Sequence, residues 1–136
     1  MKVLEIDIKL DPVNDGARLL ETEAIHKDEG ALVIATNGKY KKVTPEEADV
    51  ILEKLSGYTE SEFMGNSPYI VIVNKDKTFS YHGGRYFIGS ALVMKGTRKG
   101  LSFLTGDDYD AAGKEFMSRL VDFVANGERY PAYELQ

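Results

Sequence analysis

Hydrophobic and polar residues alternate most clearly at the start of the chain. Within residues 2–10, every second residue from Leu4 onward is apolar. In a strand this spacing places Leu4, Ile6, Ile8 and Leu10 on one face. A period of two residues is typical of a β-strand that is buried on one side. Asp11-Pro12 ends this strand, because proline has no N–H to donate to a neighbouring strand. The pattern of residues 17–29 is ambiguous between a short helix and an irregular strand.

An apolar strand and a capped helix are predicted next. Residues 31–36 are a short apolar run that ends at Asn37-Gly38, a pair that favours a tight β-hairpin turn. Thr44, Pro45 and Glu47 then match an N-cap, a first helical position and the third residue of a capping box. Apolar residues recur at helical spacing after this cap, at Ala48, Ile51, Leu52 and Leu55. A helix over residues 45–56 is therefore expected.

The second half of the chain is predicted to be mostly β. Residues 58–67 are expected to form a loop or a single turn. Short apolar segments then alternate with turn residues, a spacing that favours an antiparallel meander. These predicted strands cover residues 69–73, 78–81, 86–95 and 101–104.

A second helix is expected close to the C-terminus. An apolar stripe at helical spacing predicts that it spans residues 106–126 and ends at Gly127; the stripe holds Tyr109, Ala112, Phe116, Leu120, Phe123 and Val124. The whole chain, residues 1–136, is thus predicted to be a single α+β domain. Its antiparallel β-meander would pack against two helices, at about residues 45–56 and 106–126.

Composition excludes several classes of protein. The chain has 136 residues, 43% of them hydrophobic and 29% charged, and it contains no cysteine, so disulfide frameworks and thiolate metal sites are ruled out. Its two histidines, His26 and His82, are too few for a histidine metal cage. Uncharged apolar runs fall far short of the roughly 20 residues that a membrane span needs. We therefore expect a soluble, cytoplasmic protein without a signal peptide or cofactor.

The negative charge lies in the first half of the chain. Residues 1–68 contain 8 Lys and Arg against 14 Asp and Glu, whereas the remaining residues are close to balance. Acidic surfaces speed association with basic partners and repel nucleic-acid backbones. The leading hypothesis is a non-enzymatic accessory or inhibitory protein that binds a basic protein partner through carboxylates, with Glu46, Glu47, Asp49, Glu53, Glu60 and Glu62 as the contact residues.

A predicted turn at residues 82–85 supports an enzymatic alternative. His82 could act as a base, Gly83 and Gly84 allow close backbone approach to a ligand, and Arg85 could bind an anion. With help from Tyr81 or Tyr86, these side chains could process a small ligand or a phosphoester. A glycine-rich hairpin with a polar rim accounts for the same residues without any reaction.

Basic turns suggest a third function. Lys39, Lys41 and Lys42 surround Tyr40, while Arg98 and Lys99 follow a later predicted strand. Cationic side chains with an interleaved aromatic ring can bind single-stranded nucleic acid if the fold brings both turns to one edge. Solubilising charges at turns are the simpler interpretation.

Three carboxylates near the second helix are the best metal candidate that the pattern offers. Asp107, Asp108 and Asp110 could give oxygen ligands to a hard cation. Carboxylates in the first turn of a helix also complement the helix dipole and cap its free N–H groups. Capping is the favoured interpretation, and no metal is predicted.

One stretch of about fifty residues resembles a family of small uncharacterised proteins carried by phages and conjugative elements. The resemblance rests on the segment Tyr69–Asp76, on Arg85 and Ile88-Gly89-Ser90, and on Phe103-Leu104-Thr105 leading into the second predicted helix. In that family an asparagine precedes the arginine and a threonine follows the glycine, where this chain has Gly84 and Ser90. The resemblance implies a mobile-element origin and assigns no catalytic residues.

Overall fold

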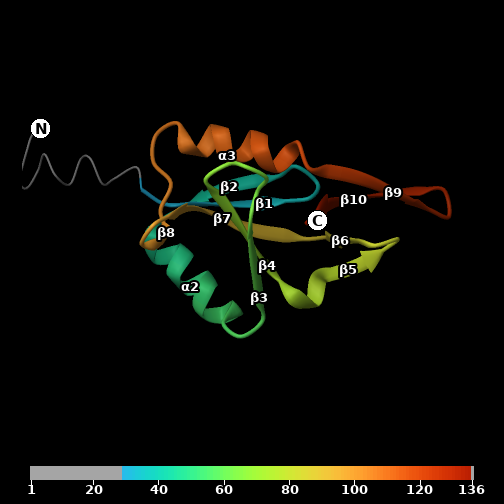
Figure 1. The fold of residues 1–136 in the computed structure, drawn as a ribbon, viewed down its shortest axis with the longest axis horizontal. Helices are drawn as coiled ribbons and strands as arrows, with labels where there is room; N and C mark the ends of the chain where they lie inside the picture. Colours follow the sequence, from blue (N-terminus) through green and yellow to red (C-terminus); the bar gives the residue numbers. More distant parts are fainter. Residues whose placement is uncertain (1–28, 136) are drawn as a thin grey trace, which may run out of the picture.

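A computed structural model describes residues 29–135 (Figure 1). The strand predicted at residues 2–10, residues 17–28 and His26 lie outside the described residues. Two antiparallel sheets and two helices make up the described part of the chain. No helix within residues 29–135 is long and apolar enough to cross a membrane.

The larger sheet, which we call the central sheet, contains six antiparallel strands. Its main path runs, in spatial order, through β2 (Tyr40–Val43), β1 (Ala31–Ala35), β7 (Ser90–Thr97), β4 (Tyr69–Asn74) and β3 (Thr59–Phe63). The sixth strand, β8 (Gly100–Ser102), pairs with the end of β7. Because β7 lies between β1 and β4, strands far apart in sequence form the middle of the sheet, and β2 and β3 form its two edges.

The smaller sheet, which we call the peripheral sheet, has four strands. They are, in spatial order, β5 (Thr78–Tyr81), β6 (Gly84–Phe87), β10 (Glu128–Glu134) and β9 (Leu120–Ala125). A short 3-10 helix, η1 (Lys75–Lys77), connects β4 of the central sheet to β5. Phe87 and Tyr133 of the peripheral sheet are buried in the same core cluster as residues of the central sheet.

The two helices, α2 (Pro45–Leu55) and α3 (Asp108–Met117), cover opposite faces of the central sheet (Figure 1). The alternation of side chains along each strand explains this, because successive residues contribute to different cores. The core on the α3 face includes Leu32, Ile34, Val71, Val93 and Phe116. The core on the α2 face includes Ala31, Val43, Ala48, Ile72, Leu92 and Met94.

The α+β class and the antiparallel sheets are confirmed, and the first helix lies within one residue of its predicted bounds. Its capping box is present in full. The Glu47 N–H donates to the Thr44 hydroxyl at 3.1 Å, and the Thr44 N–H donates to Glu47 Oε1 at 2.9 Å. Local sequence chemistry thus determines where α2 begins.

The second helix is shorter than predicted. It ends at Met117, and residues 120–134 form the β9–β10 hairpin instead of continuing the helix to residue 126. The turn of this hairpin is Asn126-Gly127, where both residues have positive φ, 54° and 81°. Such angles fit a type I′ turn, which joins two antiparallel strands. Gly127 is therefore a hairpin residue and not the end of a helix.

Two other predictions about the strands are wrong. Residues 59–63 are not part of a loop, because they form the edge strand β3 and pair with β4. The strand predicted over residues 86–95 is two strands, β6 and β7, which belong to different sheets. The chain changes sheet at Ile88-Gly89, where Gly89 has a φ of 139°, a conformation that glycine adopts without strain.

Candidate functional site

β2 is an edge strand of the central sheet, with a groove on each side of it. One groove lies between β2 and α2 and the other between β2 and α3. In the part of the chain that the structure describes, β2 pairs with β1 along one edge and no strand lies against its outer edge. Exposed strand edges carry unpaired backbone groups that can pair with another segment. This edge is the main candidate for a binding site.

The groove between β2 and α2, which we call the β2–α2 groove, has an apolar floor and a charged rim. Its volume is about 490 Å³, and it is lined by Val33, Lys41, Val43, Glu46, Glu47, Val50 and Ile51. Alternation along β2 puts Lys41 and Val43 on this face of the sheet, where Val33 of β1 pairs directly with Lys41. Helix α2 contributes the remaining residues. The groove is therefore built entirely by the segment that runs from β1 through α2.

Helix α2 presents an exposed acidic stripe beside this groove. Val50 is 50% exposed, and the exposed carboxylates Glu46, Asp49 and Glu53 follow one another at helical spacings of three and four residues. Glu47 has a structural role in addition, because the hydrogen bonds that it makes in the capping box lower the pKa of its carboxyl group, and the nearby charge of Lys41 lowers it further. Four of the six carboxylates predicted to bind a partner thus lie on one helix.

The other two predicted carboxylates lie elsewhere. Glu60 and Glu62 are in β3, at the opposite edge of the sheet, and their pairing with Val73 and Val71 places them on the α3 face. Glu60 forms a bidentate ion pair with Arg85 of the peripheral sheet, and Arg85 Nη2 lies 2.7 Å from Glu60 Oε1. This hydrogen bonding lowers the pKa of Glu60, whereas burial raises the pKa of Glu62. Glu60 therefore links the two sheets.

The structure does not bring the predicted catalytic group together. His82 is exposed in the β5–β6 turn with a φ of 49°, and its ring contacts that of Tyr81. Arg85 lies on the opposite face of β6 from Tyr86 and is held by Glu60 and Thr78. The Tyr86 ring packs against Phe79 and Phe123. Neither of the two grooves is lined by His82 or Arg85.

The two basic turns lie at opposite ends of the central sheet. The turn that contains Lys39 follows Ala35, which pairs with Ser90 at the start of β7. Arg98 and Lys99 follow Thr97 at the far end of the same strand. Lys41 and Lys42 are neighbours in β2 and point to opposite faces of the sheet, and Tyr40 shares the α3 face with Lys42. The fold therefore does not align these residues in one strip.

The three aspartates near α3 have different surroundings. Asp110 forms an ion pair with Lys114 at 3.2 Å, and Asp107 is the N-cap residue but makes no capping hydrogen bond with its side chain. Asp108 accepts a hydrogen bond from the Thr105 N–H at 3.0 Å and another from the Tyr69 hydroxyl at 2.9 Å. Among residues 29–135, no group of three or more His, Asp or Glu side chains could hold a metal ion.

Asp108 should make the stability of the protein depend on acidity. Burial favours the neutral acid, but the hydrogen bonds from Thr105 and Tyr69, together with Lys95, outweigh it and lower the pKa of Asp108 from its ordinary value of 3.8. A lowered folded-state pKa stabilises the protein above pH 3.8, and this contribution is lost as the pH falls through the folded-state pKa.

We therefore expect Asp108→Asn to lower the free energy of unfolding by about 1.5 kcal/mol at pH 7, because one of the two carboxylate oxygens that accept from the Thr105 N–H and the Tyr69 hydroxyl becomes an amide N–H₂ group. Urea denaturation should show a smaller difference at an acidic pH than at pH 7, because the wild-type carboxyl group gains a proton as the pH falls through its lowered folded-state pKa. Asp110→Asn serves as the control, because Asp110 is exposed and its ion pair adds little stability. An Asp108→Asn effect that is the same at both pH values would contradict this role.

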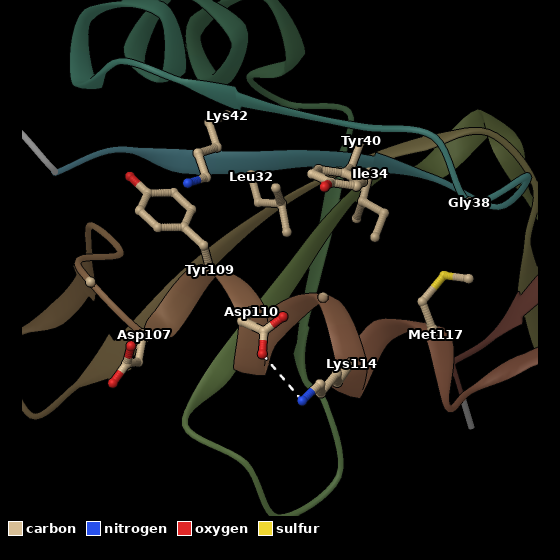
Figure 2. A pocket seen from close by; sticks show the side chains of 12 residues that line it. Leu32, Ile34, Gly38, Tyr40, Lys42, Asp107, Tyr109, Asp110, Lys114 and Met117 are labelled. Carbon is tan, nitrogen blue, oxygen red and sulfur yellow. Dashed lines mark ion pairs between the residues drawn. The ribbon is translucent and has the colours of Figure 1, made fainter.

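The second groove lies between β2 and α3, and we call it the β2–α3 groove. It has a volume of about 570 Å³, and Figure 2 shows Leu32 and Ile34 of β1 between the aromatic and charged side chains of β2 and α3. Lys42 Nζ lies 4.7 Å from the centre of the Tyr109 ring, at one end of the groove. Met117 and Gly38 lie at the other end. Most of the lining is apolar, and ionic groups lie at its margin.

Comparison with known proteins gives no relative for this chain. No family model, no curated protein and no solved structure matches it. The similarity to proteins of phages and conjugative elements therefore stays a prediction from the sequence.

Analysis of the sequence identified the carboxylates of α2 but missed the apolar floor beside them. Val33 falls within the strand predicted over residues 31–36, Val43 falls in no predicted element, and Val50 falls outside the apolar stripe of the helix. One signal was present, because an apolar residue among the polar positions of an amphipathic helix marks an exposed hydrophobic site. The pairing of β1 with β2 is what places Val33 and Val43 next to Val50.

Proposed function

We propose that this chain is a non-enzymatic protein-binding domain that holds a segment of a basic partner in the β2–α2 groove. The observation that carries the proposal is the combination of an apolar floor with the carboxylates of α2 along its rim. A partner segment that fits has an aliphatic side chain flanked by lysine or arginine. The aliphatic side chain would cover Val33, Val43 and Val50, and the basic side chains would lie beside Glu46 and Glu47.

Both parts of this interaction have a physical reason. Burying an aliphatic side chain in an apolar groove contributes roughly 25 cal/mol for each Å² of apolar surface removed from water. Exposed carboxylates add little affinity, but they speed association with a basic partner and discriminate against acidic ones. Specificity for basic segments should therefore depend on salt, whereas the apolar contact should not.

Titration with two short peptides tests the proposal. One peptide alternates leucine with lysine and the other alternates leucine with glutamate, so they differ only in charge. We expect the lysine peptide to bind at least about tenfold more tightly at low salt, and we expect amide NMR shifts at Val43, Val50 and Ile51.

Glu46→Lys should remove most of the preference for the lysine peptide. Glu128→Lys is the matched control, because Glu128 is an exposed carboxylate at the start of β10, which belongs to the peripheral sheet. Equal affinity for both peptides, or shifts confined to residues outside the groove, would refute the proposal.

A further inference from the structure

Among residues 29–135, the α3 face of the central sheet is open at the β2–α3 groove, next to the outer edge of β2. Tyr40 of β2 is 69% exposed, and Leu32 and Ile34 line the groove beside it. Among residues 29–135, no strand pairs with the outer edge of β2. A further strand at this edge would satisfy backbone groups of β2, and its side chains on the α3 face would project into the groove.

Gly30, near the start of the described residues, lies beside this groove. A Cβ atom at Gly30 would lie 2.2 Å from the Val43 carbonyl oxygen and 2.9 Å from the Tyr109 hydroxyl, so the backbone of Gly30 runs closely between β2 and α3. Gly30 therefore lies at the end of the groove that Tyr109 lines, and the residues that precede Gly30 in the sequence connect to the described chain at this point. They include the segment of residues 2–10, whose alternating pattern predicts a strand.

We propose that residues 2–10 of the same chain occupy this edge, pairing with β2 and directing Leu4, Ile6 and Ile8 into the β2–α3 groove. The length of the intervening chain permits this. Residues 11–29 can extend over about 60 Å, at roughly 3.3 Å per residue, which is several times the length of the four-residue strand β2. The alternation also fits, since a strand at a sheet edge presents every second side chain to one face.

Charge complementarity supports the same arrangement. With Ile6 and Ile8 on the α3 face, Glu5 and Asp7 would lie on the α2 face, where Lys41 projects from β2. Opposite charges on neighbouring strands stabilise their pairing. This inference does not rest on the proposed function, because the apolar contacts that carry it lie in the β2–α3 groove.

Hydrogen exchange in the full-length protein tests the inference. Pairing with residues 2–10 should protect amides of β2, and Ile8→Glu should disrupt the pairing by placing a carboxylate in the apolar groove. Alternate amides of Tyr40–Val43 point away from β1, and we expect these amides to exchange about tenfold faster in Ile8→Glu than in wild type. Amides of Leu92 and Val93 in the centre of the sheet should be unchanged, which separates local loss of pairing from global unfolding.

Lys9→Glu is the matched control, because it introduces the same residue one position later, on the opposite face of the predicted strand. Its exchange rates in β2 should equal those of wild type. The inference fails if the amides of β2 exchange equally fast in all three proteins. It also fails if the wild-type protein is a dimer by light scattering and loses that dimer in Ile8→Glu, since the segment would then occupy a second copy.

Discussion

Replacing Phe116 by alanine should lower the free energy of unfolding by about 3–5 kcal/mol. Phe116 is fully buried in the core on the α3 face, and its ring stacks on that of Tyr133 with the two centres 4.6 Å apart. The stacked pair joins α3 to the peripheral sheet, because Tyr133 belongs to β10. Truncation would leave a cavity that neither the helix nor the strand can close. Urea denaturation followed by circular dichroism measures the loss.

Met117 gives a control for this substitution at the next position in the same helix. It is 46% exposed, so Met117→Ala should change stability by no more than about 0.5 kcal/mol. Similar losses from Phe116→Ala and Met117→Ala would mean that α3 does not present Phe116 to the core as described.

Gly30→Ala should destabilise the protein by about 3 kcal/mol, although it adds only one methyl group. That methyl carbon would lie 2.2 Å from the carbonyl oxygen of Val43, a backbone atom that cannot move without separating β1 from β2. Gly30 is also bridged to Leu104, and its N–H and carbonyl group both take part in this bridge. A shift of Gly30 would therefore disturb two strand pairings. Thermal denaturation should show a lower midpoint.

Gly113→Ala is the matched control and should have the opposite sign. Gly113 lies inside α3, and a Cβ atom there meets only Leu32 Cδ2, at an ordinary contact distance of 3.9 Å. Alanine favours the helix over glycine by about 0.5–1 kcal/mol, so stability should rise by up to that amount. If both alanines were tolerated equally, the close approach of β1 and β2 at Gly30 would be incorrect.

Local signals in the sequence were sufficient to predict the elements that local chemistry determines. The helix that begins after Thr44 was predictable because its cap, its proline and its apolar spacing all agree. The hairpin at Asn37-Gly38 was predictable for a similar reason, since Gly38 has a φ of 90° and joins two short strands.

Elements that depend on distant contacts were not predictable in this way. Residues 108–124 carry an apolar stripe that fits a helix, yet the chain leaves the helix at Ser118 and forms a hairpin. Phe123 explains the choice, because it packs against Phe79 and Tyr86 of strands more than thirty residues earlier. The Asn126-Gly127 pair was the one local signal that favoured the hairpin, and it competes with the interpretation of Gly127 as a helix end.

The candidate site was predictable only in its charges. The carboxylates of α2 follow from the periodicity of one helix, whereas Glu60 and Glu62 were grouped with them by sequence proximity alone. Pairing of β3 with β4 turns those two side chains to the α3 face, and Arg85 neutralises Glu60 there. Which charges act together is decided by strand register, and register is fixed by contacts across the whole sheet.

Selection from a library of random peptides tests the account most directly, because it assumes nothing about the partner. Peptides selected on the wild-type protein should carry an aliphatic residue next to lysine or arginine. This enrichment should disappear with Val50→Asp, which places a charge in the β2–α2 groove. It should persist with Val124→Asp, the same substitution at a 69% exposed valine in β9. Enrichment of the same peptides on both variants, or of acidic peptides on the wild type, would contradict the proposed binding site.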